Sequence, residues 1–63
     1  MPTKTEISEL RHKHGITQIE AAEMVAISMS SWQKYEYGTV EMPISTWQLF
    51  KVKLALLPDI KPG

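Results

Sequence analysis

One short run of the chain gathers side chains that could hydrogen-bond to a partner. Residues 28–34 read SMSSWQK, and apart from the tryptophan they offer hydroxyl, thioether, amide and ammonium groups. Hydroxyls and amides can both donate and accept, and an ammonium group can reach an acceptor or an anion. A helix that only faces water would favour Glu, Lys and Ala. The run therefore indicates a recognition surface, which comprises Ser28, Met29, Ser30, Ser31, Gln33 and Lys34.

The sequence offers no grouping typical of catalysis or metal binding. There is no cysteine and there are three glycines, with no Ser/His/Asp set, no paired inward carboxylates and no glycine-rich phosphate loop. His12 and His14 are two residues apart, so on a helix they point to different sides and we expect both to be solvated. We expect a binding protein without a cofactor or metal, rather than an enzyme.

Length and composition favour a single folded domain that spans residues 1–63. A chain of 63 residues with 43% hydrophobic and 22% charged residues is too apolar for a disordered protein and too short for two domains. Without disulfides, stability must come from helix packing or self-association. The polar start and the short apolar runs predict a cytoplasmic protein that does not enter a membrane.

Two helices precede the recognition run. Residues 5–14 carry Ile7 and Leu10 at the spacing of one buried stripe, with Gly15 placed to end the helix. Thr17 and Glu20 then form the T-x-x-E pattern of a capping box, which predicts a second helix from residue 17. Its core-facing residues are expected to be Ala21, Ala22 and Val25.

Two further helices complete an expected all-α bundle of four to five short helices. Ser28 is a candidate N-cap for a third helix that Gly38 ends, with Trp32 and Tyr35 on its inner side. Pro43 suits the first turn of a fourth helix over about 43–57, and Pro58 would end it. The apolar residues of that helix recur at spacings of three and four, namely Ile44, Trp47, Phe50, Leu54 and Leu57.

The segment over about 17–38 is typical of the two-helix unit that fits the major groove of DNA. It resembles the Cro/repressor (XRE-type) helix-turn-helix family, in its small stand-alone phage-type form. The resemblance runs from about Leu10 to Leu54. It is carried by Thr17, Gln18, Ala22, Ile27, Ser28, Glu36, Gly38 and Pro43. It implies a compact lambda-repressor-like bundle that binds double-stranded DNA.

The resemblance also implies roles for individual residues. Met29, Ser30, Gln33 and Lys34 would face bases, and Gln18 would hold a backbone phosphate and brace the start of the third helix. Further phosphate contacts would come from Tyr37 and Thr39, and the same surface includes Thr17, Ser28 and Ser31. Arg11 and Glu36 would form an ion pair between the first and third helices. We expect the alanines, Ile27, Trp32 and Tyr35 to pack in the core without touching a partner. For the polar groups, the alternative is that they are simply solvated.

Two features depart from a typical DNA-binding member. Ala26 stands where the family has a glycine that favours positive φ, at a cost of about 1 kcal/mol. Seven basic and seven acidic residues give zero net charge, and the only charge in the loop 39–42 is Glu41. Since Lys and Arg supply most non-specific DNA affinity, binding requires that the charges be segregated locally.

The fourth helix carries more apolar residues than one buried stripe needs, which predicts a homodimer. We expect its interface to include Trp47, Phe50, Leu54 and Leu57. A two-fold dimer would bind an inverted-repeat operator and act as a repressor, or autorepressor, of a phage or phage-derived operon. The alternative is a protein-interaction module with a protein partner, such as an antitoxin or an adaptor that uses Trp47 and Phe50.

Overall fold

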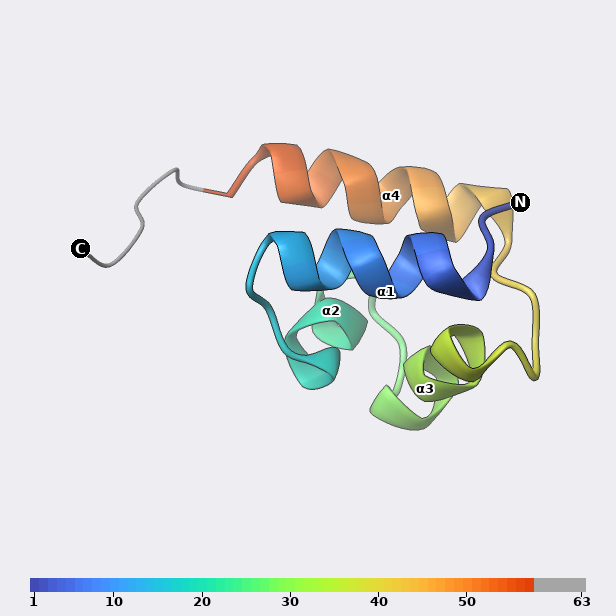
Figure 1. The fold of residues 1–63 in the computed structure, drawn as a ribbon. Coiled ribbons are helices and arrows are strands. Elements are labelled where there is room, and N and C mark those ends of the chain that lie inside the picture. The colour runs from blue at the N-terminus through green and yellow to red at the C-terminus, as the bar shows by residue number, and fades with distance from the viewer. Residues whose placement is uncertain (58–63) are drawn as a thin grey trace.

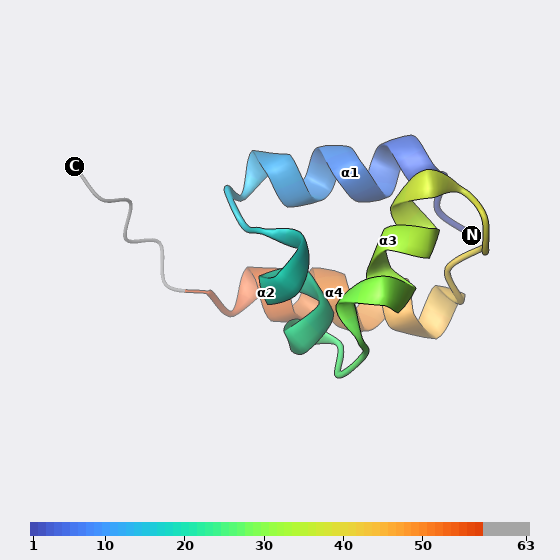
Figure 2. The ribbon, with the colours of Figure 1, turned by 90° about the horizontal axis from the view of Figure 1, so that it is seen from below.

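The computed structural model describes residues 1–57, which form four α-helices and no β-strand. They are α1 (Lys4–Lys13), α2 (Gln18–Met24), α3 (Met29–Tyr37) and α4 (Ile44–Ala55). In both views α1 and α4 run in the same direction, and α2 and α3 lie together beneath them in Figure 1 (Figures 1 and 2). The expected all-α class is confirmed. Pro58, expected to end the last helix, lies outside the described residues.

Side-chain caps define where the first three helices begin. The capping box of Thr17 and Glu20 is present at α2, as predicted, and an equivalent box of Thr3 and Glu6 starts α1. The hydroxyl of Ser28 accepts the backbone N–H of Ser31 at the start of α3. Each cap satisfies an N–H group that would otherwise lack a partner in the first helical turn. These bonds set the exit and entry points of the chain around α2 and α3.

The core lies where all four helices meet. Its buried side chains are Ile7, Ala21, Ala22, Val25, Trp32, Met42, Phe50 and Leu54. Trp32 is fully buried and meets Phe50 edge to face, with 4.8 Å between ring centroids. That aromatic contact joins α3 to α4, while the small alanines of α2 let neighbouring helices approach closely. The predicted inner side of α2 is confirmed by the burial of Ala21, Ala22 and Val25.

The turn between α2 and α3 requires a left-handed residue. Ala26 has a φ of 58°, and the N–H of Ile27 returns to the carbonyl of Ala22 at 3.0 Å. A Cβ in this conformation crowds the following carbonyl, so Ala26 holds local strain that glycine would avoid. The expected positive φ at this position is confirmed. Gly15 and Gly38 take the same region after α1 and α3, at 66° and 82°.

The prediction that Phe50 and Leu54 lie at a dimer interface is wrong. Phe50 is 0% exposed and Leu54 is 6% exposed, because both fill the core beneath α4. Trp47 is half-buried against the same core and Leu57 is exposed. Of the residues at spacings of three and four, Trp47, Phe50 and Leu54 lie on the inner side of α4, whereas Ile44 and Leu57 are exposed. The outer side carries Leu49, Val52 and Leu56.

Over residues 1–57, no helix combines the length and the apolar character that crossing a bilayer requires.

Candidate functional site

The recognition run forms the outer side of α3. Met29, Ser30 and Lys34 are exposed, while Ser31 and Gln33 are half-buried. Trp32 points the opposite way into the core. One side of this helix is therefore anchored by an aromatic ring, and the other side presents hydroxyl, amide, thioether and ammonium groups to the surroundings.

An ion pair locks the last turn of α3 to α1. Arg11 Nε donates to Glu36 Oε2 at 2.5 Å, and Arg11 Nη2 donates to Glu36 Oε1 at 3.0 Å. Arg11 Nη1 also donates to the carbonyl of Ile16 at 3.0 Å. Such a two-pronged contact fixes orientation as well as distance. The ion pair that the resemblance implied is present, and its two side chains are 11% and 6% exposed.

Glu36 accepts from two further donors. Trp32 Nε1 donates to Oε2 from within α3, and Gln18 Nε2 donates to Oε1 from α2 at 3.3 Å. The carboxylate thus ties together α1, α2 and α3. Burial alone would raise the pKa of Glu36, but the hydrogen bonds from Arg11, Trp32 and Gln18 outweigh it and lower the pKa below the ordinary value. Glu36 is therefore held in its ionised form.

Gln18 connects this carboxylate to the outer side of α3. While its Nε2 donates to Glu36, its Oε1 accepts from Gln33 Nε2 at 3.2 Å. The resemblance placed the brace from Gln18 at the start of α3, where Met29 stands. The structure places the Gln18 contact one turn further along, because the Met29 side chain has no donor to offer. Gln33 is consequently held by its neighbours.

The remaining predicted residues fall into two groups. The side-chain oxygens of Thr17 and Ser28 accept backbone N–H groups as helix caps, at 3.1 and 3.2 Å. Tyr37 and Thr39 are exposed at and after the end of α3, and the N–H of Thr39 bonds the carbonyl of Lys34. The caps build the scaffold, and the two exposed hydroxyls extend the polar surface beyond the helix.

The positive and the negative side chain of α3 do not neutralise each other. The helix contains one lysine, Lys34, and one carboxylate, Glu36. Because Glu36 is paired with Arg11 behind the helix, its charge is balanced there. Lys34 is exposed on the outer side and has Ser30 one turn before it. Of the two charges that α3 carries, the one on its outer side is therefore the positive charge of Lys34.

Two side-chain contacts, one at this site and one at the start of α1, were not predicted from the sequence. The indole N–H of Trp32 was assigned only a packing role, yet it donates to Glu36. The contact is visible in the spacing, because residues four apart on a helix lie on one face. The cap at Thr3 also had a signal, since Thr3 and Glu6 repeat the T-x-x-E pattern found at Thr17.

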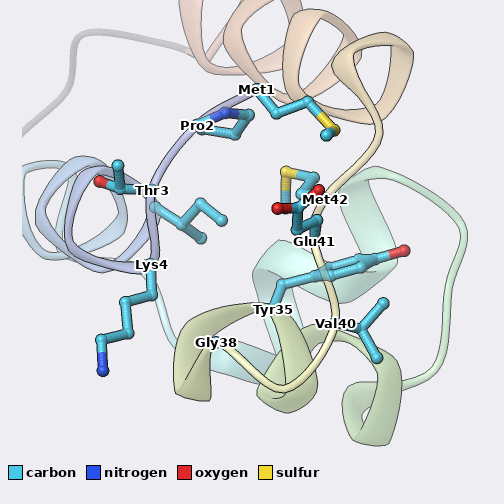
Figure 3. A pocket seen from close by; sticks show the side chains of 10 residues that line it. Met1, Pro2, Thr3, Lys4, Tyr35, Gly38, Val40, Glu41 and Met42 are labelled. Atoms are coloured by element: carbon cyan, nitrogen blue, oxygen red, sulfur yellow. The ribbon is translucent and has the colours of Figure 1, made fainter.

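A separate hollow of about 320 Å³ lies between the N-terminal segment, the end of α3 and the loop before α4. Figure 3 shows the thioethers of Met1 and Met42 close to each other and Tyr35 reaching across below them. The lining is mainly apolar and includes Ile7 and Val40. None of the residues in the predicted recognition surface lines this hollow, so it is not the candidate site.

Comparisons with protein-family models, with curated proteins and with solved structures found no match to this chain.

Proposed function

We propose that this chain is a sequence-specific double-stranded DNA-binding protein that lays α3 in the major groove. The observation that carries the proposal is the two-sided character of α3, with a hydrogen-bonding outer side and an inner side anchored by Trp32 and Glu36. An α-helix with its side chains is about 10–12 Å across, which fits the roughly 12 Å width of the groove. The resemblance to the Cro/repressor family points to the same function.

The outer side of α3 offers groups that match base edges. Lys34 can reach guanine acceptors or a phosphate, Ser30 can pair with several bases, and Met29 can pack on a thymine methyl group. Tyr37 and Thr39 have hydroxyls suited to phosphate oxygens. A rigid helix that presents these groups favours recognition, since the side chains are positioned before DNA arrives.

Zero net charge is compatible with this function because affinity can be shared between two copies. The loop after α3 contains Glu41 and no cation, so we expect one protomer to bind DNA weakly. A two-fold dimer would place two α3 helices roughly 34 Å apart, one helical turn of DNA. We propose a homodimer on an inverted-repeat operator that represses a phage or phage-derived operon by occupying the site.

The outer side of α4 supports self-association. Leu49, Val52 and Leu56 lie at helical spacings of three and four and are 41%, 56% and 75% exposed. Covering such a row of side chains would remove apolar surface from water. These three residues replace Phe50 and Leu54 as the proposed dimer contacts.

The same apolar row also favours the second candidate function, a protein-interaction module such as an antitoxin or an adaptor. In that case α4 would bind a different protein, and α3 would not be required. Exchanging Gln33 and Lys34 for Ala should abolish DNA binding under the first function and leave partner binding intact under the second.

The test of the first function is selection of bound sites from a random pool of duplex DNA. We expect enrichment of an inverted repeat whose half-sites are about 10 base pairs apart, centre to centre. Failure to enrich any sequence at low salt would contradict the proposal.

The role of Lys34 can be tested on the enriched duplex by fluorescence anisotropy across a salt series. Lys34→Ala should weaken binding and reduce the slope of log affinity against log salt by about 1 per protomer, if the ammonium meets a phosphate. Lys13→Ala is the matched control, because Lys13 lines the groove between α1 and α4 and has the same charge. Equal losses in both variants would argue against a specific contact from α3.

A further inference from the structure

We infer that a relay of side-chain hydrogen bonds from Glu36 through Gln18 fixes the direction of the Gln33 amide, and that Gln33 thereby selects adenine at one position of each half-site. This inference rests on the proposed DNA binding, because it concerns how the same side of α3 reads a base. It adds a specificity-determining residue and a positioning residue to that surface.

The relay starts from a group that can only accept. An ionised carboxylate has no donor, and the pKa of Glu36 lies below its ordinary value although burial acts in the opposite direction. Glu36 Oε1 lies 3.3 Å from the Gln18 side chain and already accepts from Arg11. Gln18 must therefore turn its Nε2 toward Glu36, since its own Oε1 would meet the carboxylate as a second acceptor.

The direction of Gln18 determines that of Gln33. With Nε2 committed to Glu36, Gln18 presents Oε1 to the outer side of α3, where Gln33 Nε2 donates to it at 3.2 Å. A reversed Gln33 amide would bring two carbonyl oxygens together. Reversal would require both amides to turn and would place an oxygen of Gln18 against Glu36. The structure thus favours one orientation of each amide.

The orientation leaves one donor and one acceptor on Gln33. An amide nitrogen carries two hydrogens, so one N–H and the Oε1 atom remain for a partner. In the major groove adenine presents an acceptor at N7 and a donor at N6, whereas guanine presents two acceptors. The available pair of groups matches adenine. Because Gln33 is half-buried and already bonded, it also has less rotamer freedom to lose on binding.

The experiment is selection from random duplex DNA with the full chain and four variants. The wild type should enrich adenine at one position of each half-site, and Gln33→Ala should reduce that preference roughly tenfold. Gln18→Ala should relax the same position several-fold, since it frees the Gln33 amide to turn. Gln33→Glu should shift the preference toward cytosine, whose N4 is a donor. Gln48→Ala is the matched control, because Gln48 is an exposed glutamine of α4, and this variant should leave the base preference unchanged.

A second measurement follows the relay in the protein without DNA. The side-chain NH₂ resonances of Gln33 should move in Gln18→Ala and in Gln18→Met, and circular dichroism would show which variants fold. If both Gln18 variants unfold, the selection with Gln33→Ala still tests the inference. That variant truncates a side chain at the surface of α3.

The outcomes separate this inference from the proposed function. If the wild type enriches no sequence, DNA binding itself fails and the inference fails with it. If the wild type enriches a site but Gln33→Ala keeps the same base preferences, the inference is overturned and DNA binding stands. An adenine preference that survives Gln18→Ala with unmoved Gln33 resonances would likewise overturn the relay.

Discussion

Ala26 is strained because the contacts of its neighbours fix its backbone conformation. The hydrogen bond from Ile27 to Ala22 closes the turn, and Ala26 must adopt a φ of 58° for the chain to enter α3. For an L-residue with a Cβ this region costs roughly 1–2 kcal/mol. Burial of Ala22 and Val25 on the helix before it offsets that cost.

We predict that Ala26→Gly stabilises the fold. Removing the Cβ relieves the strain in the folded state, whereas glycine also stabilises the unfolded chain through its greater conformational entropy. We expect a net increase of about 0.5–1 kcal/mol in the free energy of unfolding. In a domain of this size that corresponds to a rise of several degrees in melting temperature, which thermal unfolding by circular dichroism would detect.

Gly15→Ala is the matched control because it makes the reverse exchange at a φ of 66°. A Cβ added at Gly15 meets nothing within 4 Å, so only backbone strain acts there. We expect this variant to lose about 1 kcal/mol. If both variants moved the melting temperature in the same direction, positive φ would not be the cause.

At the scale of elements, α3 is held in place by two contacts on its inner side, one turn apart. Trp32 packs on Phe50 in the core, and Glu36 binds Arg11 of α1 and Gln18 of α2. Breaking such a pair leaves a charge with few partners and little water, which costs more than the pair itself contributes. Glu36 is therefore the residue through which α1 and α2 orient the recognition surface.

This arrangement predicts a loss of stability in acid. The folded pKa of Glu36 lies below the ordinary value of 4.5, so the unfolded chain binds more protons there. The contribution is complete above about pH 4.5 and is lost as the pH falls through the folded pKa. Glu6 and Glu20 add to the same trend, since cap hydrogen bonds lower their pKa values too.

The Glu36→Gln variant isolates the contribution of the ion pair to this loss of stability in acid. At pH 7 we expect this variant to lose about 2 kcal/mol of unfolding free energy, as hydrogen bonds to a charged group are weakened. Urea unfolding at pH 7, 5, 4 and 3 should give a shallower fall with acidification than in the wild type. Parallel curves for the two proteins would contradict the assignment.

At the scale of the whole molecule, α3 and α4 expose surfaces of different chemical character. The outer side of α3 carries the hydrogen-bonding groups, whereas the outer side of α4 carries Leu49, Val52 and Leu56. The core packs between these two surfaces, so each can change without altering the other. Self-association through α4 would leave α3 free to meet DNA.

We predict that Val52→Glu converts the proposed dimer to a monomer. Val52 is 56% exposed, so a carboxylate can be accommodated in one protomer, but in the proposed interface it would be desolvated and face its symmetry mate. Sedimentation over a concentration series should show the wild type as a dimer at high micromolar concentration and the variant as a monomer, with affinity for the inverted repeat reduced at least tenfold.

Val40→Glu is the control for this test. Val40 is 46% exposed but lies in the loop before α4, outside the apolar row. The same exchange there should leave the sedimentation unchanged. A wild type that sediments as a monomer at high micromolar concentration, with and without DNA, would contradict the dimer.

The sequence by itself determined the elements, because helix ends and core stripes depend on local chemistry. The box of Thr17 and Glu20, the cap at Ser28 and the stop at Gly38 are each satisfied within a few residues of the chain. The resemblance supplied the Arg11–Glu36 pair, which residue types alone could not have matched across 25 positions.

Only the tertiary structure decided how shared side chains are used. The spacing on α4 could not tell which apolar residues face the core, so Phe50 and Leu54 were assigned to an interface although both are buried. Nor could the sequence pattern show that Gln18 of α2 would bond Gln33 of α3. These choices depend on how the four helices meet in space, because long-range packing and the few available hydrogen-bond partners are settled together.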